Sequence, residues 1–130
     1  MPHKDPIERK KWARQYYCLN RSVRLAEQAK YVRSHKAEIA ARGKAKRAQD
    51  KIDAINHYGG PKCVCCGETN IKFLTLDHEK NDAKSYPLEA RVTPYAWLRK
   101  KGYPDIGLRV QCYNCNCGRA HNGGVCPHLE

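Results

Sequence analysis

Two pairs of cysteines, each separated by two residues, carry the clearest chemistry in the chain: Cys63/Cys66 and Cys112/Cys115. Together they supply four thiolates, the ligand set of a closed, tetrahedral, structural zinc site. Cys65 lies inside the first pair, so the partner of Cys66 is open, and we prefer Cys63 because that choice repeats the spacing of the second pair. A redox dithiol is the competing interpretation, but no pattern here resembles a thioredoxin-like βαβ unit.

Polar side chains with a second kind of chemistry lie near both pairs. Asp77 and His78 follow the first pair, and Asn116 comes directly after Cys115. Carboxylate and amide oxygens suit Mg²⁺ or Mn²⁺, and a histidine can accept a proton from water near neutral pH. Adjacent side chains in a strand point to opposite faces, so this pair acts together only if the strand ends there.

Short elements must position these residues. We expect a strand at 71–76 that delivers Asp77 and His78 at its end, and a polar, irregular stretch at 79–92. Thr93 and Pro94 predict the start of a helix that runs to Lys101, in which Tyr95, Trp97 and Leu98 pack in a core rather than stack on bases. A second strand at 106–110 and a helix from Asn116 to about 122–124 follow. The predicted order is strand, long insertion, strand, helix.

The preceding residues, 1–57, read as a basic helical arm. They hold 15 Lys and Arg against 6 Asp and Glu, a net charge of +9, whereas residues 58–130 hold 10 against 7, or +3. Asp5 and Pro6 predict the start of one long helix or two, with a break near 20–22 or at Gly43, and the sequence HYGGP ends it. The charge favours a nucleic-acid partner.

The arm offers two kinds of contact. A narrow apolar stripe, spaced 4-3-4-3, predicts packing on the rest of the chain or on a second copy, which would make a homodimer. Its members are Trp12, Tyr16, Leu19, Val23 and Ala26. The predicted phosphate contacts are Arg14, Arg21, Arg24, Arg33, Arg42, Lys44, Lys46 and Arg47.

Composition restricts the class of protein. The 130 residues allow one small domain with an extension, and 41% hydrophobic residues with a mean hydropathy of −0.83 predict a thin core that needs a staple. No apolar run is long enough to cross a membrane, and the start MPHKDPIERKK lacks the apolar segment of a signal peptide. We therefore expect no membrane partner and an intracellular, reducing location, the cytoplasm of a bacterial or phage-infected cell, where zinc thiolates are favoured over disulfides.

The stretches LTLDHEKND and IGLRVQCYNCN resemble the HNH, or His-Me finger, endonucleases. The similarity is greatest to the branch that includes phage recombination endonuclease VII and many small phage HNH nucleases. It covers residues 58–130, including WLRKKGYP and the terminal CPH. The fold implied is α+β: a small zinc-stapled ββα-metal domain at 58–130 preceded by the helical arm at 1–57.

The resemblance also implies roles for individual residues. Cys63, Cys66, Cys112 and Cys115 would bind structural zinc; Asp77 and Asn116 would bind the catalytic Mg²⁺ or Mn²⁺; and His78 would be the general base. Arg119 matches a basic position that could contact DNA phosphate. The reaction implied is hydrolysis of DNA phosphodiester bonds to a 5′-phosphate and a 3′-hydroxyl.

Some positions stay open. The residue that orients the base has three candidates, Glu79, Asn81 and Asn114, and the third polar position has two, His121 and Asn122. Cys126 and His128 either complete a further metal site or pack the tail; we expect packing, because only two ligands are evident there. The roles of Cys65 and Cys117 are open. The competing functions are a non-catalytic, zinc-stapled nucleic-acid-binding protein and a structural subunit that dimerises through the arm.

Overall fold

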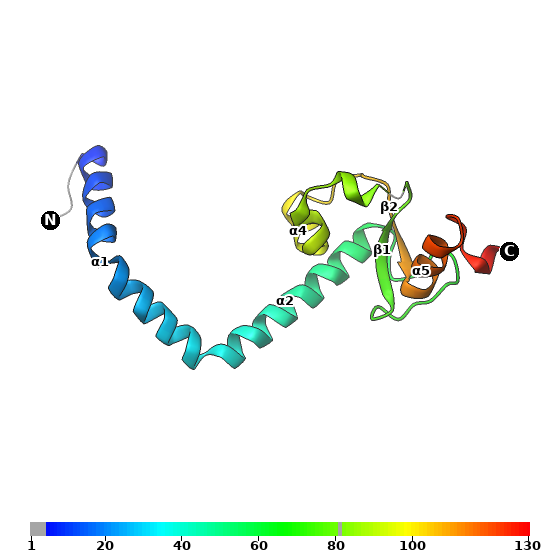
Figure 1. The fold of residues 1–130 in the computed structure, drawn as a ribbon, viewed down its shortest axis with the longest axis horizontal. Coiled ribbons are helices and arrows are strands. Elements are labelled where there is room, and N and C mark those ends of the chain that lie inside the picture. Colours follow the sequence, from blue (N-terminus) through cyan, green and yellow to red (C-terminus); the bar gives the residue numbers. More distant parts are fainter. Residues whose placement is uncertain (1–4, 81) are drawn as a thin grey trace. The chain divides into compact units, whose positions relative to one another are not determined.

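The chain consists of two units that are described separately. A computed structural model describes residues 5–80 and 82–130, and the chain divides into an N-terminal unit that ends at Gly43 and a C-terminal unit, Lys44–Glu130. The N-terminal unit contains helix α1, Pro6–Ser34, and the first part of helix α2, Lys36–His57 (Figure 1). No residue of α1 is buried. None of the helices in the described residues is long and apolar enough to span a membrane.

The start of α1 confirms the prediction, whereas the helix break lies elsewhere. Asp5 caps the helix, its side chain accepting a hydrogen bond from the N–H of Ile7 at 2.9 Å, and Pro6 occupies the first turn. The chain leaves helical geometry at His35, not at 20–22 or Gly43. There the Ser34 hydroxyl donates to the Tyr31 carbonyl at 2.9 Å, so local side-chain hydrogen bonds compete with the backbone. Sequence alone carries no strong signal for such a local competition.

The second half of α2 belongs to the compact C-terminal unit. Asp50, Ala54 and Ile55 are buried, and Asp50 pairs with Arg99 at 3.0 Å. The compact unit therefore begins at Lys44 rather than at residue 58, the expected boundary. A helix that looks uniformly basic along its length contains one face that packs in a core.

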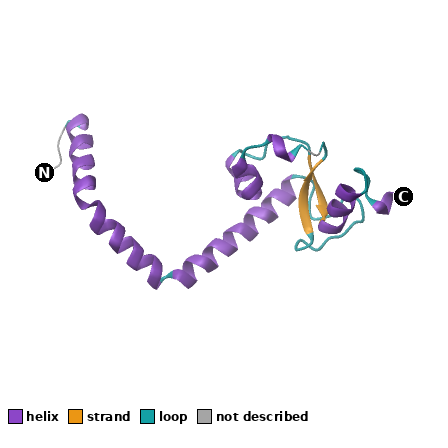
Figure 2. Ribbon diagram, in the orientation of Figure 1, coloured by secondary structure: helices purple, strands orange, loops and turns teal. Residues whose placement is uncertain are grey.

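A two-stranded antiparallel sheet lies at the centre of the compact unit. Strand β1, Leu74–His78, pairs with strand β2, Leu108–Cys112 (Figure 2). The register sets Asp77 opposite Arg109 and His78 opposite Leu108. Both strands lie about two residues later than predicted, so Asp77 and His78 are inside β1 and not beyond its end. Helix α5, Tyr113–His121, follows β2 directly and starts three residues before Asn116.

The stretch between the strands is more regular than expected. It contains the single-turn helix η1, Ala83–Ser85, helix α3, Leu88–Val92, and helix α4, Pro94–Lys100. Thr93 precedes α4 without capping it, because its hydroxyl donates to the Glu89 carbonyl at 3.1 Å. The short helix η2, Pro127–Leu129, closes the described chain.

Two small clusters of buried side chains hold the compact unit together. Around the sheet, Ile55, Leu74 and Val110 pack with four cysteines: Cys63, Cys112, Cys115 and Cys126. Beside α4, Trp97 and Leu98 pack on Ala54, which confirms their expected role in a core. The observed class is a small α+β protein with long N-terminal helices, a two-stranded sheet and a cysteine cluster that could hold a metal.

Ile55→Ala is expected to destabilise the compact unit by about 2–5 kcal/mol, because Ile55 is fully buried and its truncation leaves a cavity. Ile39→Ala, the same change on an exposed face of the same helix, is the matched control and should leave stability within about 0.5 kcal/mol. Urea denaturation measures both. Equal effects would contradict the assignment of residues 44–57 to the compact unit.

Candidate functional site

The four predicted zinc ligands come together in the structure. The sulfur atoms of Cys63, Cys66, Cys112 and Cys115 all lie within 4.8 Å of one another. The Cys66 and Cys112 sulfurs are 3.6 Å apart. A tetrahedron with zinc–sulfur bonds of about 2.3 Å has sulfur–sulfur edges of about 3.8 Å, so this group suits a metal such as zinc.

Tight turns aim these thiols at one another. The N–H of Gly67 donates to the Cys63 carbonyl at 3.1 Å, and Gly67 has φ of 78°, a conformation that favours glycine. In the second half, the Cys112 sulfur caps α5 by accepting from the N–H of Cys115 at 3.4 Å. The second pair therefore spans the junction of a strand and a helix, and the first pair a turn.

The surroundings of these thiols favour the ionisation of one cysteine but oppose the simultaneous ionisation of several. Burial acts to raise the pKa of Cys63, but hydrogen bonds from backbone N–H groups, first that of Cys66, outweigh it and lower the pKa to about 6. Burial, followed by hydrogen bonds with neighbouring thiols, raises the pKa of Cys115. Four thiolates this close need a cation to balance their charge, which is what a bound metal supplies.

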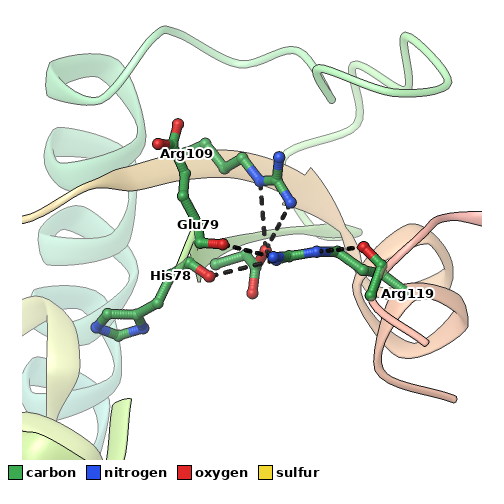
Figure 3. A network of polar contacts seen from close by, with 6 residues as sticks. His78, Glu79, Arg109 and Arg119 are labelled. Carbon is green, nitrogen blue, oxygen red and sulfur yellow. Dashed lines mark hydrogen bonds and ion pairs between the residues drawn. The ribbon is translucent and has the colours of Figure 1, made fainter. Parts of the chain in front are cut away.

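Asp77 is buried and held by two arginines. Its Oδ2 accepts from Nε and Nη2 of Arg109, both at 3.3 Å, and from Nη1 of Arg119. The guanidinium groups of Arg109 and Arg119 approach the same point from β2 and α5 (Figure 3). The single negative charge of the Asp77 carboxylate therefore lies beside two positively charged guanidinium groups.

Arg119 makes further contacts that tie α5 to the end of β1. Its Nη1 donates to the His78 carbonyl at 3.2 Å and its Nη2 to the Glu79 carbonyl at 2.6 Å. Its Nε donates to the Gly124 carbonyl at 3.0 Å. The residue expected to contact phosphate thus has its guanidinium engaged within the protein.

His78 lies on the other face of β1. Its imidazole contacts the ring of Tyr86, with centroids 5.2 Å apart, and points away from Arg119 (Figure 3). It lines a cavity of about 310 Å³ whose other walls include Arg91, Trp97 and Leu98. Because β1 continues through His78, strand alternation separates its side chain from that of Asp77. The two residues do not form one cluster in this structure.

The remaining predicted positions are placed as follows. Asn116 is half-buried on α5, one residue after Cys115. Of the candidates for the orienting and third polar positions, Glu79, Asn114 and His121 are exposed. Asn122 donates to the Glu130 carboxylate at 2.7 Å, and Asn81 lies outside the described residues.

The predicted phosphate contacts on the arm are all exposed. Arg42 pairs with Glu38 at 2.8 Å, and the Arg24 guanidinium lies 6.0 Å from the centre of the Tyr17 ring. The apolar stripe is also exposed: Trp12 and Tyr16 stack with centroids 5.3 Å apart and are each about half exposed.

The sequence does not predict the partner of Asp77, and it leaves a further metal site at Cys126 and His128 as the less favoured alternative to packing of the tail. Arg109 faces Asp77 only because of the strand register, which a single sequence does not disclose. Cys65, Cys126 and His128 gather around Cys115 as a second group of four ligand atoms within 4.8 Å. The signal for this group was the unexplained cysteine inside the first pair together with the terminal CPH.

Cys112→Ser is expected to reduce the zinc content and to destabilise the compact unit, because Cys112 is both a member of the cysteine group that could hold a metal and the cap of α5. A loss of about 2 kcal/mol would lower the unfolding midpoint of a unit of this size by about 8–16 °C. Cys18→Ser, which changes an exposed thiol on α1, is the control and should alter neither quantity. Atomic spectrometry and calorimetry measure the two effects; retention of full zinc content in Cys112→Ser would contradict the assignment.

Comparisons with protein-family models, with curated protein sequences and with solved structures found no match. The compact unit contains a cluster of four cysteine thiols suited to a metal, a buried carboxylate that pairs with two arginines, and a histidine that lines a separate cavity.

Proposed function

We propose that the protein is a DNA endonuclease of the HNH, or His-Me finger, type. The observation that carries the proposal is the order of elements in the compact unit: β1 with Asp77-His78 near its end, antiparallel β2, then α5, with four thiols at their junction. Two antiparallel strands followed by a helix support the ββα arrangement that the resemblance of LTLDHEKND and QCYNCN implies. The cysteine group would act as a structural zinc staple.

His78 is the residue on which hydrolysis depends in this proposal. Its imidazole accepts a proton from water, the water oxygen forms a bond to phosphorus, and the bond from phosphorus to the 3′ oxygen breaks. The 3′ oxygen takes a proton from solvent water and becomes the 3′-hydroxyl. A histidine suits this role because an imidazole nitrogen can accept a proton from a nearby water molecule, and histidine is the side chain that most often acts as a general base. Arg91 lines the same cavity and supplies a positive charge on that side of β1.

The resemblance also implies a divalent ion at Asp77 and Asn116, and the surroundings of Asp77 bear on whether such an ion fits. Asp77 and Asn116 offer oxygens of the kind that Mg²⁺ or Mn²⁺ prefers. In this structure, however, the Asp77 carboxylate already accepts from Arg109 and Arg119, and a divalent ion there would face two cations. The arrangement does not fit a bound divalent ion, and no step of the reaction is assigned to one. Mg²⁺ dependence would require these guanidinium groups to release Asp77.

His78→Ala is expected to abolish cleavage, by at least about 100-fold for the loss of a general base, while zinc content and DNA affinity stay unchanged. His57→Ala, a change of the same kind at a position that stacks on Tyr103, is the control. Supercoiled and branched DNA are incubated with each protein in Mg²⁺, in Mn²⁺ and without either, in chelator-free buffer so that zinc is retained.

Three outcomes of this assay decide between functions. Cleavage by the wild type and by the His57 variant, with no cleavage by the His78 variant, supports the proposal. Equal cleavage by the His78 variant assigns the activity to another residue. If the wild type cleaves neither substrate under any condition, the nuclease proposal fails.

A non-catalytic, zinc-stapled nucleic-acid-binding protein is the second candidate. The observation that favours it is the doubly balanced Asp77, which serves as a structural ion-pair centre in the arrangement seen here. The basic arm serves either function, because exposed Arg and Lys on α1 and α2 can contact phosphates on any sequence. The exposed stripe of Trp12, Tyr16 and Leu19 would support dimerisation of the same arm.

DNA binding through the arm is expected to depend steeply on salt. Replacing Arg14, Arg21 and Arg24 together with glutamine should reduce the slope of log K against log salt by about 0.9 for each phosphate that the variant no longer neutralises. Arg42→Gln should have a smaller effect, because Arg42 is already paired with Glu38. Fluorescence anisotropy at several salt concentrations measures the slopes, and an unchanged slope in the triple variant would show that DNA binds to another part of the surface.

A further inference from the structure

A second group of metal-binding side chains lies beside the four-cysteine group. The ligand atoms of Cys65, Cys115, Cys126 and His128 are all within 4.8 Å of one another. The Nδ1 of His128 is 3.3 Å from the Cys115 sulfur and 3.4 Å from the Cys126 sulfur. With zinc bonds of about 2.3 Å to sulfur and about 2.05 Å to nitrogen, a tetrahedral site has sulfur–nitrogen edges of about 3.5 Å. These spacings therefore suit zinc.

The fold seats the C-terminal tail to form this group. A side-chain carbon added at Gly118 of α5 would lie 3.0 Å from the ring of Pro127, so glycine allows the helix and the tail to approach closely without displacement. The tail packs there through η2, and Cys126 is buried although its neighbours are exposed. Packing was the expected role of this tail, and here packing delivers two ligands to two others.

Cys115 belongs to both groups and is fully buried between them. A thiolate sulfur that binds one metal keeps lone pairs with which it can bind a second. We propose that the chain binds two zinc ions, one in each group, with the Cys115 thiolate bridging them. The ligands of this two-metal site are Cys63, Cys66 and Cys112 on one side, Cys65, Cys126 and His128 on the other, and Cys115 between.

The charges around the second group fit this assignment. Six thiolates with two divalent ions leave a net charge of about 2−, which favours nearby cations. Arg109 and Arg119 line the concavity that also contains Cys65 and Cys126.

Metal stoichiometry tests the two-zinc site. Full-length protein purified with zinc is expected to contain about two zinc ions per chain, measured by atomic spectrometry against amino-acid analysis. Cys126→Ser/His128→Ala should contain about one and stay folded, because the four-cysteine group is intact. Cys117→Ser, which changes an exposed thiol of α5 outside both groups, should keep two.

Cadmium-113 NMR of protein in which zinc has been replaced by cadmium-113 tests whether the Cys115 sulfur bridges the two metals, and it requires no change of Cys115. Two resonances split by mutual coupling through the shared sulfur are expected, and one resonance in the double variant. Two unsplit resonances would overturn the bridge. One zinc ion per chain in the wild type, two retained in the double variant, or a disulfide between Cys65 and Cys126 found by thiol counting would overturn the second site.

Discussion

The close approach of four cysteine sulfurs is the constraint around which the compact unit is built. The sulfurs of Cys63, Cys66, Cys112 and Cys115 lie within 4.8 Å of one another at the junction of a turn, β2 and α5. Apolar burial is modest there: Ile55, Leu74 and Val110 are the only buried aliphatic side chains in that cluster among the described residues. A metal ion bound by these sulfurs would therefore contribute stability that this core does not supply on its own.

The alternation of side chains along β1 then places Asp77 and His78 on opposite faces of the sheet. β1 continues through His78, so Asp77 turns toward α5 and its arginines, and His78 turns toward α3, α4 and the cavity lined by Tyr86. If both residues took part in hydrolysis, the phosphate would have to lie on the face of β1 that carries His78, while the Asp77 side chain would act from the opposite face. In the structure Asp77 holds α5 on the sheet, which is a structural role whatever the chemistry of His78.

The features that depend on local signals were predictable from sequence, and those that depend on register were not. The Asp5-Pro6 helix start and the pairing of the two Cys-x-x-Cys turns follow from spacing and capping chemistry, and both are present. The predicted strand 71–76 ends before Asp77, whereas β1 extends through His78, its last residue. Arg109 opposite Asp77, and Cys126 with His128 beside Cys115, arise from long-range packing that one sequence does not encode in any local pattern.

Helix α5 links the thiol cluster to the polar network. Cys115 and Arg119 are four residues apart, so they lie on neighbouring turns of one face of the helix. Cys115 fixes the start of α5 against the cysteine cluster, and Arg119 then reaches Asp77 and the carbonyls of His78 and Glu79. The end of β1 is therefore positioned by the same helix that the thiols anchor. A metal bound at Cys115 would thus be coupled to the placement of His78 through one turn of helix, and the candidate metal site and the proposed reaction centre lie on the same element.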